Sequence, residues 1–139
     1  MIVLDTNVLS ELMRPAPAER VIRWVAAQPA TALYTTSIAQ AEVLHGILLL
    51  PAGRRRNALQ TATEAIFSED FAGRVLPFGS EAAHSYASIA TERRRAGRPI
   101  SHFDAQIAAI SRSAGAAIAT RNVLDFAGCG IEVVNPWEV

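Results

Sequence analysis

Short apolar runs alternate along the chain with longer segments in which apolar residues recur at helical spacing. The short runs predict strands at residues 2–4, 33–36, 75–78, 116–120 and 131–134. The longer segments predict helices over residues 7–13, 19–27, 37–50, 57–67, 80–95 and 101–113, with Ser37, Ser80 and Ser101 as caps of three of them. The predicted strands are apolar and lack an alternation of polar residues. This pattern is typical of an α/β fold whose parallel sheet is covered by helices on both faces.

Length and composition predict a single domain over residues 1–139. The chain is 50% hydrophobic and 19% charged, which excludes intrinsic disorder and a collagen-like repeat. No segment has the ~20 consecutive apolar residues of a membrane span, and Asp5 interrupts the first apolar run early, unlike a secretory signal. Cys129 is the only cysteine, so an internal disulfide and a zinc knuckle are both excluded. We therefore expect a cytoplasmic protein with no membrane association.

The charges are balanced in number but not in kind. The formal net charge is zero, and all 13 basic residues are arginines. Without lysine, the chain can form neither a Schiff base nor a Walker A phosphate loop. Two arginine clusters, at residues 54–56 and 93–98, either contact RNA phosphates or form solvated helix faces, of which the second is the commoner meaning.

Two acidic residues stand at positions that suit a ligand site. Asp5 directly follows the first predicted strand, and parallel α/β sheets bind ligands beyond the carboxyl ends of their strands. The structural alternative for Asp5 is an Asx turn or a helix N-cap. Glu42 lies in the helix at residues 38–50, which is apolar almost all round and is therefore expected to be buried. A glutamate there needs either a metal ion or an arginine partner.

Asp104 is the third acidic candidate. It ends the segment Ser101-His102-Phe103-Asp104, which also has the pattern of a helix capping box. Because it borders the apolar stripe Phe103, Ile107 and Ile110, we expect it to face inward at a helix N-terminus. Carboxylates that converge repel one another and need a cation, and oxygen ligands with few imidazoles select Mg²⁺ or Mn²⁺. Such a cation typically serves phosphate chemistry.

Five segments that include these residues resemble the PIN-domain family. Residues 1–10 resemble the family's opening, Glu42 within residues 37–43 resembles its helix glutamate, and Asp104 within residues 100–108 resembles its third acidic motif. Residues 119–122 resemble its fourth motif, and residues 135–137 resemble the ending of one subgroup. The resemblance covers the whole chain and is greatest to VapC- and FitB-type toxins of bacterial type II toxin–antitoxin systems.

This resemblance implies a PIN-like three-layer fold with a five-stranded parallel sheet flanked by helices. It implies an Mg²⁺-dependent endoribonuclease toxin that forms a homodimer, with Mn²⁺ expected to substitute for Mg²⁺. It also implies a cognate antitoxin, often a ribbon-helix-helix protein, that binds operator DNA and blocks the active site with its tail. The toxin is then expected to meet operator DNA only through the antitoxin.

The resemblance also assigns roles to the acidic residues in hydrolysis of an RNA phosphodiester bond. It implies that Asp5 and Asp104 bind the metal directly. Glu42 is either a third ligand or the holder of a metal-bound water. The residues expected to orient these groups or to contact phosphate are Thr6, Asn7, Thr120 and Arg121.

The fourth candidate catalytic residue departs from the family pattern. Many relatives have an aspartate at the position of Asn122, whose carbonyl oxygen can still bind a metal's water but adds no charge. Asp125 follows three residues later and can replace it if Asn122 begins a helical turn. A solvated loop residue is an equally open interpretation of Asp125.

Two other functions compete with the nuclease. A phosphotransfer protein of the haloacid-dehalogenase or receiver type also places an aspartate after its first strand, but it needs a lysine to hold the phosphate, which this chain lacks. A catalytically weakened PIN module, altered at Asn122, acts mainly by binding an antitoxin or RNA, and this alternative stays open. His102, Trp24 and Trp137 are interpreted as structural or surface residues.

Overall fold

Five short parallel strands form the central sheet of the computed structural model, which describes residues 1–139. The strands are β1 (Ile2–Leu4), β2 (Leu33–Thr36), β3 (Val75–Leu76), β4 (Ala117–Ala119) and β5 (Val133–Val134). Their order in the sheet is β3-β2-β1-β4-β5, so β1 lies in the middle between β2 and β4. The prediction of a five-stranded parallel sheet is confirmed.

The later strands are shorter than their apolar runs predicted. β3 ends at Leu76 because Pro77 has no N–H to donate to the ladder. β4 pairs with β5 through only Ile118 and Ala119. The Thr120 N–H still donates to the Val134 carbonyl at 2.9 Å, which holds the end of β4 beside β5.

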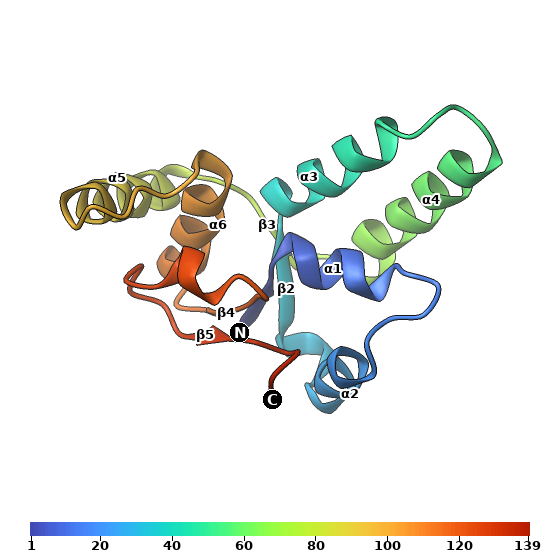
Figure 1. Ribbon diagram of the computed structural model, residues 1–139, viewed down its shortest axis with the longest axis horizontal. Coiled ribbons are helices and arrows are strands. Elements are labelled where there is room, and N and C mark those ends of the chain that lie inside the picture. The colour runs from blue at the N-terminus through green and yellow to red at the C-terminus, as the bar shows by residue number, and fades with distance from the viewer.

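Six helices cover the two faces of the sheet (Figure 1). They are α1 (Thr6–Leu12), α2 (Glu19–Ala27), α3 (Ser37–Leu48), α4 (Arg54–Ala65), α5 (Ser80–Arg95) and α6 (His102–Ser113). Short 3₁₀ turns lie at Ala30–Ala32 and Val123–Phe126, and a π-helical turn at Ile66–Asp70 continues α4. Helices α5 and α6 lie on one side of the sheet, and α1 to α4 lie on the other (Figure 1). None of the helices has the length and apolar character needed to cross a membrane.

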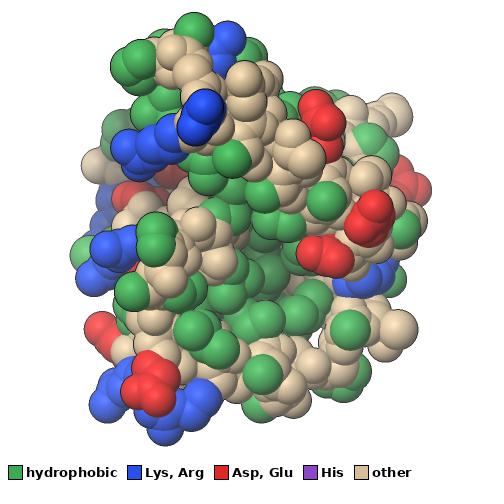
Figure 2. Space-filling model, turned by 90° about the vertical axis from the view of Figure 1, so that its right-hand side faces the viewer, with side chains coloured by type: hydrophobic (Ala, Val, Ile, Leu, Met, Phe, Trp, Pro, Cys, Tyr) green, Lys and Arg blue, Asp and Glu red, His purple; other side chains and the backbone are tan.

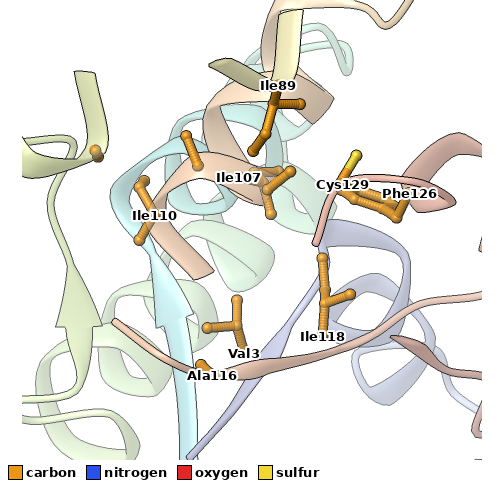
Figure 3. Close-up of a cluster of buried hydrophobic side chains, with 11 residues drawn as sticks. Val3, Ile89, Ile107, Ile110, Ala116, Ile118, Phe126 and Cys129 are labelled. Carbon is orange, nitrogen blue, oxygen red and sulfur yellow. The ribbon is translucent and has the colours of Figure 1, made fainter. Parts of the chain in front are cut away.

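The sheet separates two hydrophobic cores of 11 residues each. Val3 and Leu4 are neighbours in β1 and point to opposite faces, because side chains alternate along a strand. Val3 belongs to the core with Ile89 of α5 and Ile107 of α6 (Figure 3). Leu4 belongs to the other core, which includes Val43 of α3. One strand therefore anchors both helical layers.

The starts of α3 and α5 correct the predicted caps. Thr36, not Ser37, caps α3, because its Oγ1 accepts a hydrogen bond from the Ala39 N–H at 3.0 Å. Ser80 is the first residue of α5, and Gly79 precedes it with no side chain to cap the helix.

The start of α4 also differs from prediction. The helix begins at Arg54 rather than at residue 57, with the Gly53 carbonyl accepting from the Asn57 N–H at 3.1 Å. Residues 54–56 therefore form its first turn, which suits arginine because arginine favours helices.

Helix α3 is not buried all round, contrary to the prediction. Ala39, Val43 and Ile47 face the core, but Leu48 is 53% exposed and Leu49, just after the helix, is 72% exposed. The helix ends before residue 50 because a proline follows at position 51, and the residue before a proline disfavours helical geometry.

A buried arginine joins α5 to the segment after β4. Arg93 Nε donates to the Arg98 carbonyl at 2.7 Å, and Nη1 donates to the carbonyls of Asp125 and Ala127, each at 2.8 Å. The side chain is 7% exposed and forms no ion pair. Arg93 is therefore not part of a basic surface, as its sequence cluster indicated. Its buried guanidinium instead donates to backbone carbonyls of the segments after α5 and β4.

Replacement of Arg93 by methionine should destabilise the fold. The change leaves three partly buried carbonyls without this donor, and we expect the free energy of unfolding to fall by about 2–4 kcal/mol. Urea unfolding measures this. The control is Arg94→Met, at an exposed arginine one residue along the same helix, for which we expect a change within about 0.5 kcal/mol. Equal effects of the two substitutions would contradict the assignment.

Candidate active site

The candidate site lies where β1 and β4 end side by side. The sheet extends from β1 in both directions. Strands β2 and β3 lie on one side of β1, and β4 and β5 lie on the other. Open parallel sheets bind ligands at such a switch point, outside the carboxyl ends of the strands. Asp5 follows β1 and Thr120 follows β4, and Thr120 Oγ1 donates to Asp5 Oδ2 at 2.8 Å.

Asp5 is buried and held by three hydrogen bonds. Besides Thr120, the Thr6 N–H donates to Oδ1 at 2.8 Å and Asn7 Nδ2 donates to Oδ2 at 3.3 Å. The bond from Thr6 also makes Asp5 the N-cap of α1, so the structural interpretation of this residue is correct as well. The cap fixes one carboxylate oxygen at the helix start while the other is fixed from β4.

Burial raises the pKa of Asp5 from 3.8 to about 6. The hydrogen bonds from Thr120 and Thr6 oppose this shift by stabilising the ionised form, whereas the charges of Asp104 and Glu42 add to it. Both of these carboxylates are thus close enough to disfavour the ionisation of Asp5.

Glu42 projects from α3 toward the start of α1. Its Oε1 accepts a hydrogen bond from the Thr6 hydroxyl at 2.8 Å. None of the ion pairs in the structure includes Glu42, so the proposed arginine partner is absent. Glu42 is half-buried rather than enclosed by apolar residues, because one face of α3 is open.

Asp104 lies in the first turn of α6, as predicted. Ser101 caps this helix, since its Oγ accepts from the Asp104 N–H at 3.2 Å. Burial raises the pKa of Asp104 despite the opposing hydrogen bond from Ser101. Phe103, which was assigned to the inward stripe of α6, is instead 54% exposed, whereas Ile107 is buried.

These side chains line one pocket of about 480 Å³. Its walls include the three predicted metal-binding carboxylates and four other predicted site residues: Asp5, Thr6, Asn7, Glu42, Asp104, Arg121 and Asn122. Thr120 lies beneath the pocket, fully buried, and binds Asp5. Asn7 links the two sides, because its Nδ2 donates to Thr120 Oγ1 at 3.2 Å and its Oδ1 accepts from the Arg121 N–H at 3.2 Å.

The structure places Asn122 and Asp125 differently. Asn122 lines the acidic pocket, and its backbone N–H donates to Thr120 Oγ1 at 3.1 Å. Asp125 is exposed in the turn at Val123–Phe126 and lines a neighbouring hollow instead. Its charge still contributes to raising the pKa of Asp104. The turn therefore brings Asn122, but not Asp125, into the pocket.

Four further pocket residues were not predicted: Ser10, Glu11, Arg14 and Trp137. Helical spacing could have found two of them, because Ser10 and Arg14 follow Thr6 at intervals of four residues. Glu11 is 5% exposed and accepts from the Ala18 N–H at 3.1 Å. Trp137 has no local signal, since it reaches the pocket only through the path of the chain after β5.

The donor set of the pocket suits a hard divalent cation. Asp5, Glu42 and Asp104 supply carboxylate oxygens, and none forms an ion pair within the chain. No three acidic, histidine or cysteine side chains in the structure are close enough together to hold one ion between them. Mg²⁺ accepts such a site, because it keeps several waters and takes one or two protein carboxylates. The residues fit a partly hydrated cation, and their assignment as ligands stays a prediction.

Comparison with known proteins agrees with this arrangement. A family model described as PIN domain matches residues 2–124. The chain is 41% identical over 138 residues to a VapC ribonuclease of Sinorhizobium fredii, with 99% of each chain covered. It is 38% identical over 137 residues to toxin FitB of Neisseria gonorrhoeae, again with 99% of each covered.

Solved structures show the same fold. The crystal structure of FitAcB from Neisseria gonorrhoeae matches with a TM-score of 0.94 and 37% identity over all of both chains. A structure of FitAB bound to a DNA fragment gives the same TM-score and identity over 100% of this chain and 97% of that one. VapBC-5 of Mycobacterium tuberculosis, from the VapBC family of toxin-antitoxin systems, matches with a TM-score of 0.69 and 25% identity over 96% of each chain. The chain belongs to the PIN-domain family.

Proposed function

We propose that this protein is a metal-dependent endoribonuclease and the toxin of a toxin–antitoxin pair. The observation that carries the proposal is the pocket at the switch point, where Asp5, Glu42 and Asp104 gather without arginine partners. Uncompensated carboxylates of this kind suit a cation that acts on phosphate. The similarity over nearly the whole chain to a VapC ribonuclease and to toxin FitB supports RNA as the substrate and toxicity as the outcome.

The chain's own residues divide the chemical work between them. A divalent cation, when bound, lowers the pKa of water and neutralises charge on the phosphate oxygens. Asp5 and Asp104 would hold the cation, and the hydrogen bonds that Asp5 accepts from Thr120 and Thr6 fix the orientation of its carboxylate. Glu42 has Oε1 fixed by the Thr6 hydroxyl and keeps Oε2 to accept a hydrogen bond from water.

An antitoxin is the proposed protein partner. Similar proteins include a VapBC toxin-antitoxin system and FitAB bound to DNA, which supports an antitoxin as a partner. We propose that this antitoxin is of ribbon-helix-helix type and that the toxin meets operator DNA only through it. A second pocket of about 500 Å³ between α1, α3 and α4 is partly apolar and shares four residues with the acidic pocket: Thr6, Ser10, Arg14 and Glu42. On this side of the molecule, apolar side chains fill the middle of the face and charged ones surround them (Figure 2). An antitoxin tail that binds there can reach the acidic pocket. Because RNA and such an antitoxin are cytoplasmic, we propose that the toxin acts in the cytoplasm.

A homodimer is the proposed oligomeric state. Helix α3 has a second face, formed by Ala41, Leu44, His45 and Leu48 at helical spacing, that does not contact the core. Leu48 and Leu49 together expose a large apolar area, and exposed apolar patches on small domains often mark interfaces. We assign this face of α3 to the contact with a second copy of the chain.

Purified protein, freed of any antitoxin, should cleave total RNA with Mg²⁺ or Mn²⁺ and not with EDTA. Asp5→Asn and Asp104→Asn should each lower the cleavage rate by more than the roughly 10- to 100-fold typical of a lost supporting residue, because each removes a charge from the pocket. Asp70→Asn is the matched control, at an exposed aspartate outside the pocket, and should cleave like the wild type. Denaturing gels and end-labelled fragments measure the products.

Fragments that persist in EDTA or in both pocket variants would show a contaminating nuclease and contradict the proposal. If the wild type neither cleaves RNA nor binds Mn²⁺ by calorimetry, the weakened PIN module becomes the better description. Mn²⁺ binding without cleavage indicates a narrow RNA target that is absent from the sample.

Metal-free protein should lose stability as the pH rises from 3.8 to about 6. Over this interval the folded state binds more protons at Asp5 than the unfolded state, so the free energy of unfolding falls with rising pH. The full effect is about 2–3 kcal/mol, since one pKa unit corresponds to about 1.4 kcal/mol. Urea unfolding of wild type and Asp5→Asn should diverge over this interval, and Mg²⁺ should reduce the difference at neutral pH. If the free energies of unfolding of the two proteins change with pH in parallel, the prediction is wrong.

Leu48→Glu should convert the dimer to a monomer. The substitution places a charge in the apolar contact, where it cannot be solvated, and light scattering after size-exclusion chromatography reads the mass. Leu124→Glu is the control, because Leu124 is 80% exposed in the turn at Val123–Phe126, away from α3. A monomeric wild type, or a dimer that survives Leu48→Glu, rules out this interface.

A further inference from the structure

An aromatic ring and an arginine meet at the edge of the acidic pocket. Trp137 is the one hydrophobic residue among the 11 that line the pocket. Arg121 Cζ lies 5.1 Å from the centroid of the Trp137 ring, within the distance at which an aromatic face attracts a guanidinium. Residues that follow two neighbouring strands, β4 and β5, are thus joined beside the site.

The charge of Arg121 has no partner in the chain. Arg14, the other arginine of the pocket, lies 3.4 Å from the Glu11 carboxylate. Arg121 forms no ion pair, although three unpaired carboxylates share its pocket. Its backbone is fixed by the bond to Asn7 Oδ1, and its guanidinium rests on Trp137 alone. A free cation at the rim of an acidic pocket suits a ligand that itself carries phosphate.

The contact with Trp137 leaves the N–H donors of Arg121 available. A cation–π contact uses none of the guanidinium's N–H donors in a hydrogen bond, so these donors stay free to bind two phosphate oxygens. Trp137 is itself held in place, because its backbone N–H donates to Asn135 Oδ1 at 3.0 Å and its backbone carbonyl accepts from Arg20 at 3.4 Å. The ring also packs against the core that contains Leu4. Trp137 is therefore a fixed surface against which the exposed Arg121 side chain lies.

We propose that Trp137 is a positioning residue that holds Arg121 over the pocket, so that the guanidinium binds a phosphate of the RNA strand next to the one that is cut. This inference rests on the proposed function, because it takes RNA as the substrate. Arg121 lines both the acidic pocket and the neighbouring hollow of about 450 Å³. A strand that extends from one to the other passes over its guanidinium.

Binding and cleavage are measured separately. The binding probe is a short fluorescein-labelled single-stranded RNA of mixed sequence, titrated by fluorescence anisotropy in an Asp5→Asn background that prevents hydrolysis. Trp137→Leu, Trp137→Phe, Arg121→Ala and the double variant Arg121→Ala/Trp137→Leu are compared over a range of salt concentrations. In the background with Asp5 intact, kcat and KM are measured for the same substitutions on a cleaved RNA.

Trp137→Leu should weaken RNA binding by about two- to fivefold, the equivalent of one exposed cation–π contact. Trp137→Phe should retain most of the affinity, because it keeps an aromatic face. Arg121→Ala should lower the slope of log Kd against log salt by about 0.7, the value for one phosphate of a single strand. Trp137→Leu should have no further effect once Arg121 is alanine, and both substitutions should raise KM more than they lower kcat.

Trp24→Leu is the matched control, because Trp24 packs against the same core but lines a different hollow. The inference is overturned if Trp24→Leu weakens binding as much as Trp137→Leu, if Trp137→Leu acts equally without Arg121, or if RNA does not bind. If substitution of Arg121 or Trp137 changes neither the kcat nor the KM of metal-dependent cleavage, the inference is refuted and the proposed nuclease function stands. RNA binding that depends on Arg121 and Trp137, by a wild type that neither cleaves RNA nor binds Mn²⁺, refutes the nuclease and supports the contact.

Discussion

A carboxylate buried at the end of the central strand is the constraint on which this site depends. Asp5 is 4% exposed, and burial raises its pKa to about 6. The buried carboxylate accepts hydrogen bonds from Thr6, Asn7 and Thr120 and has no cationic partner in the chain. Donors orient the ionised carboxylate and offset part of its desolvation, but they do not neutralise it. An external cation therefore gains more from this position than from any exposed aspartate of the chain.

The order of the strands makes this arrangement possible. Asp5 and Thr120 are 115 residues apart in sequence, yet they are neighbours because β1 pairs with β4 across the switch point of the sheet. Asn7 then bonds to Thr120 and to the backbone of Arg121, which ties the start of α1 to the segment after β4. Arg93 holds the far end of that segment through the carbonyls of Asp125 and Ala127. The pocket wall that carries Asn122 is consequently fixed at both ends.

The features predicted correctly from sequence have local causes, and the others depend on contacts between distant residues. The run that ends at Asp5 and the capping pattern before Asp104 are each complete within a few residues, so strand β1 and the start of α6 were predictable. The apolar pattern of α3 could not distinguish a buried face from an exposed one, and Leu48 was therefore misplaced. Arg93 is buried because carbonyls some 30 residues later need donors, which no local pattern indicates. Trp137 joins the pocket only because β5 lies beside β4.

The two glutamates of the pocket show how the chain separates structural charge from available charge. Glu11 accepts the Ala18 N–H and lies 3.4 Å from Arg14, so its carboxylate is bonded and compensated within α1 and the loop that follows. Glu42 receives only the neutral hydroxyl of Thr6, which orients one oxygen and leaves its charge uncompensated. The charge of Glu11 is thus compensated by an arginine, whereas the charge of Glu42, in the same pocket, is not. Asp5 and Asp104, like Glu42, form no ion pair. The uncompensated negative charge is therefore concentrated near the ends of β1 and β4, where parallel sheets bind ligands.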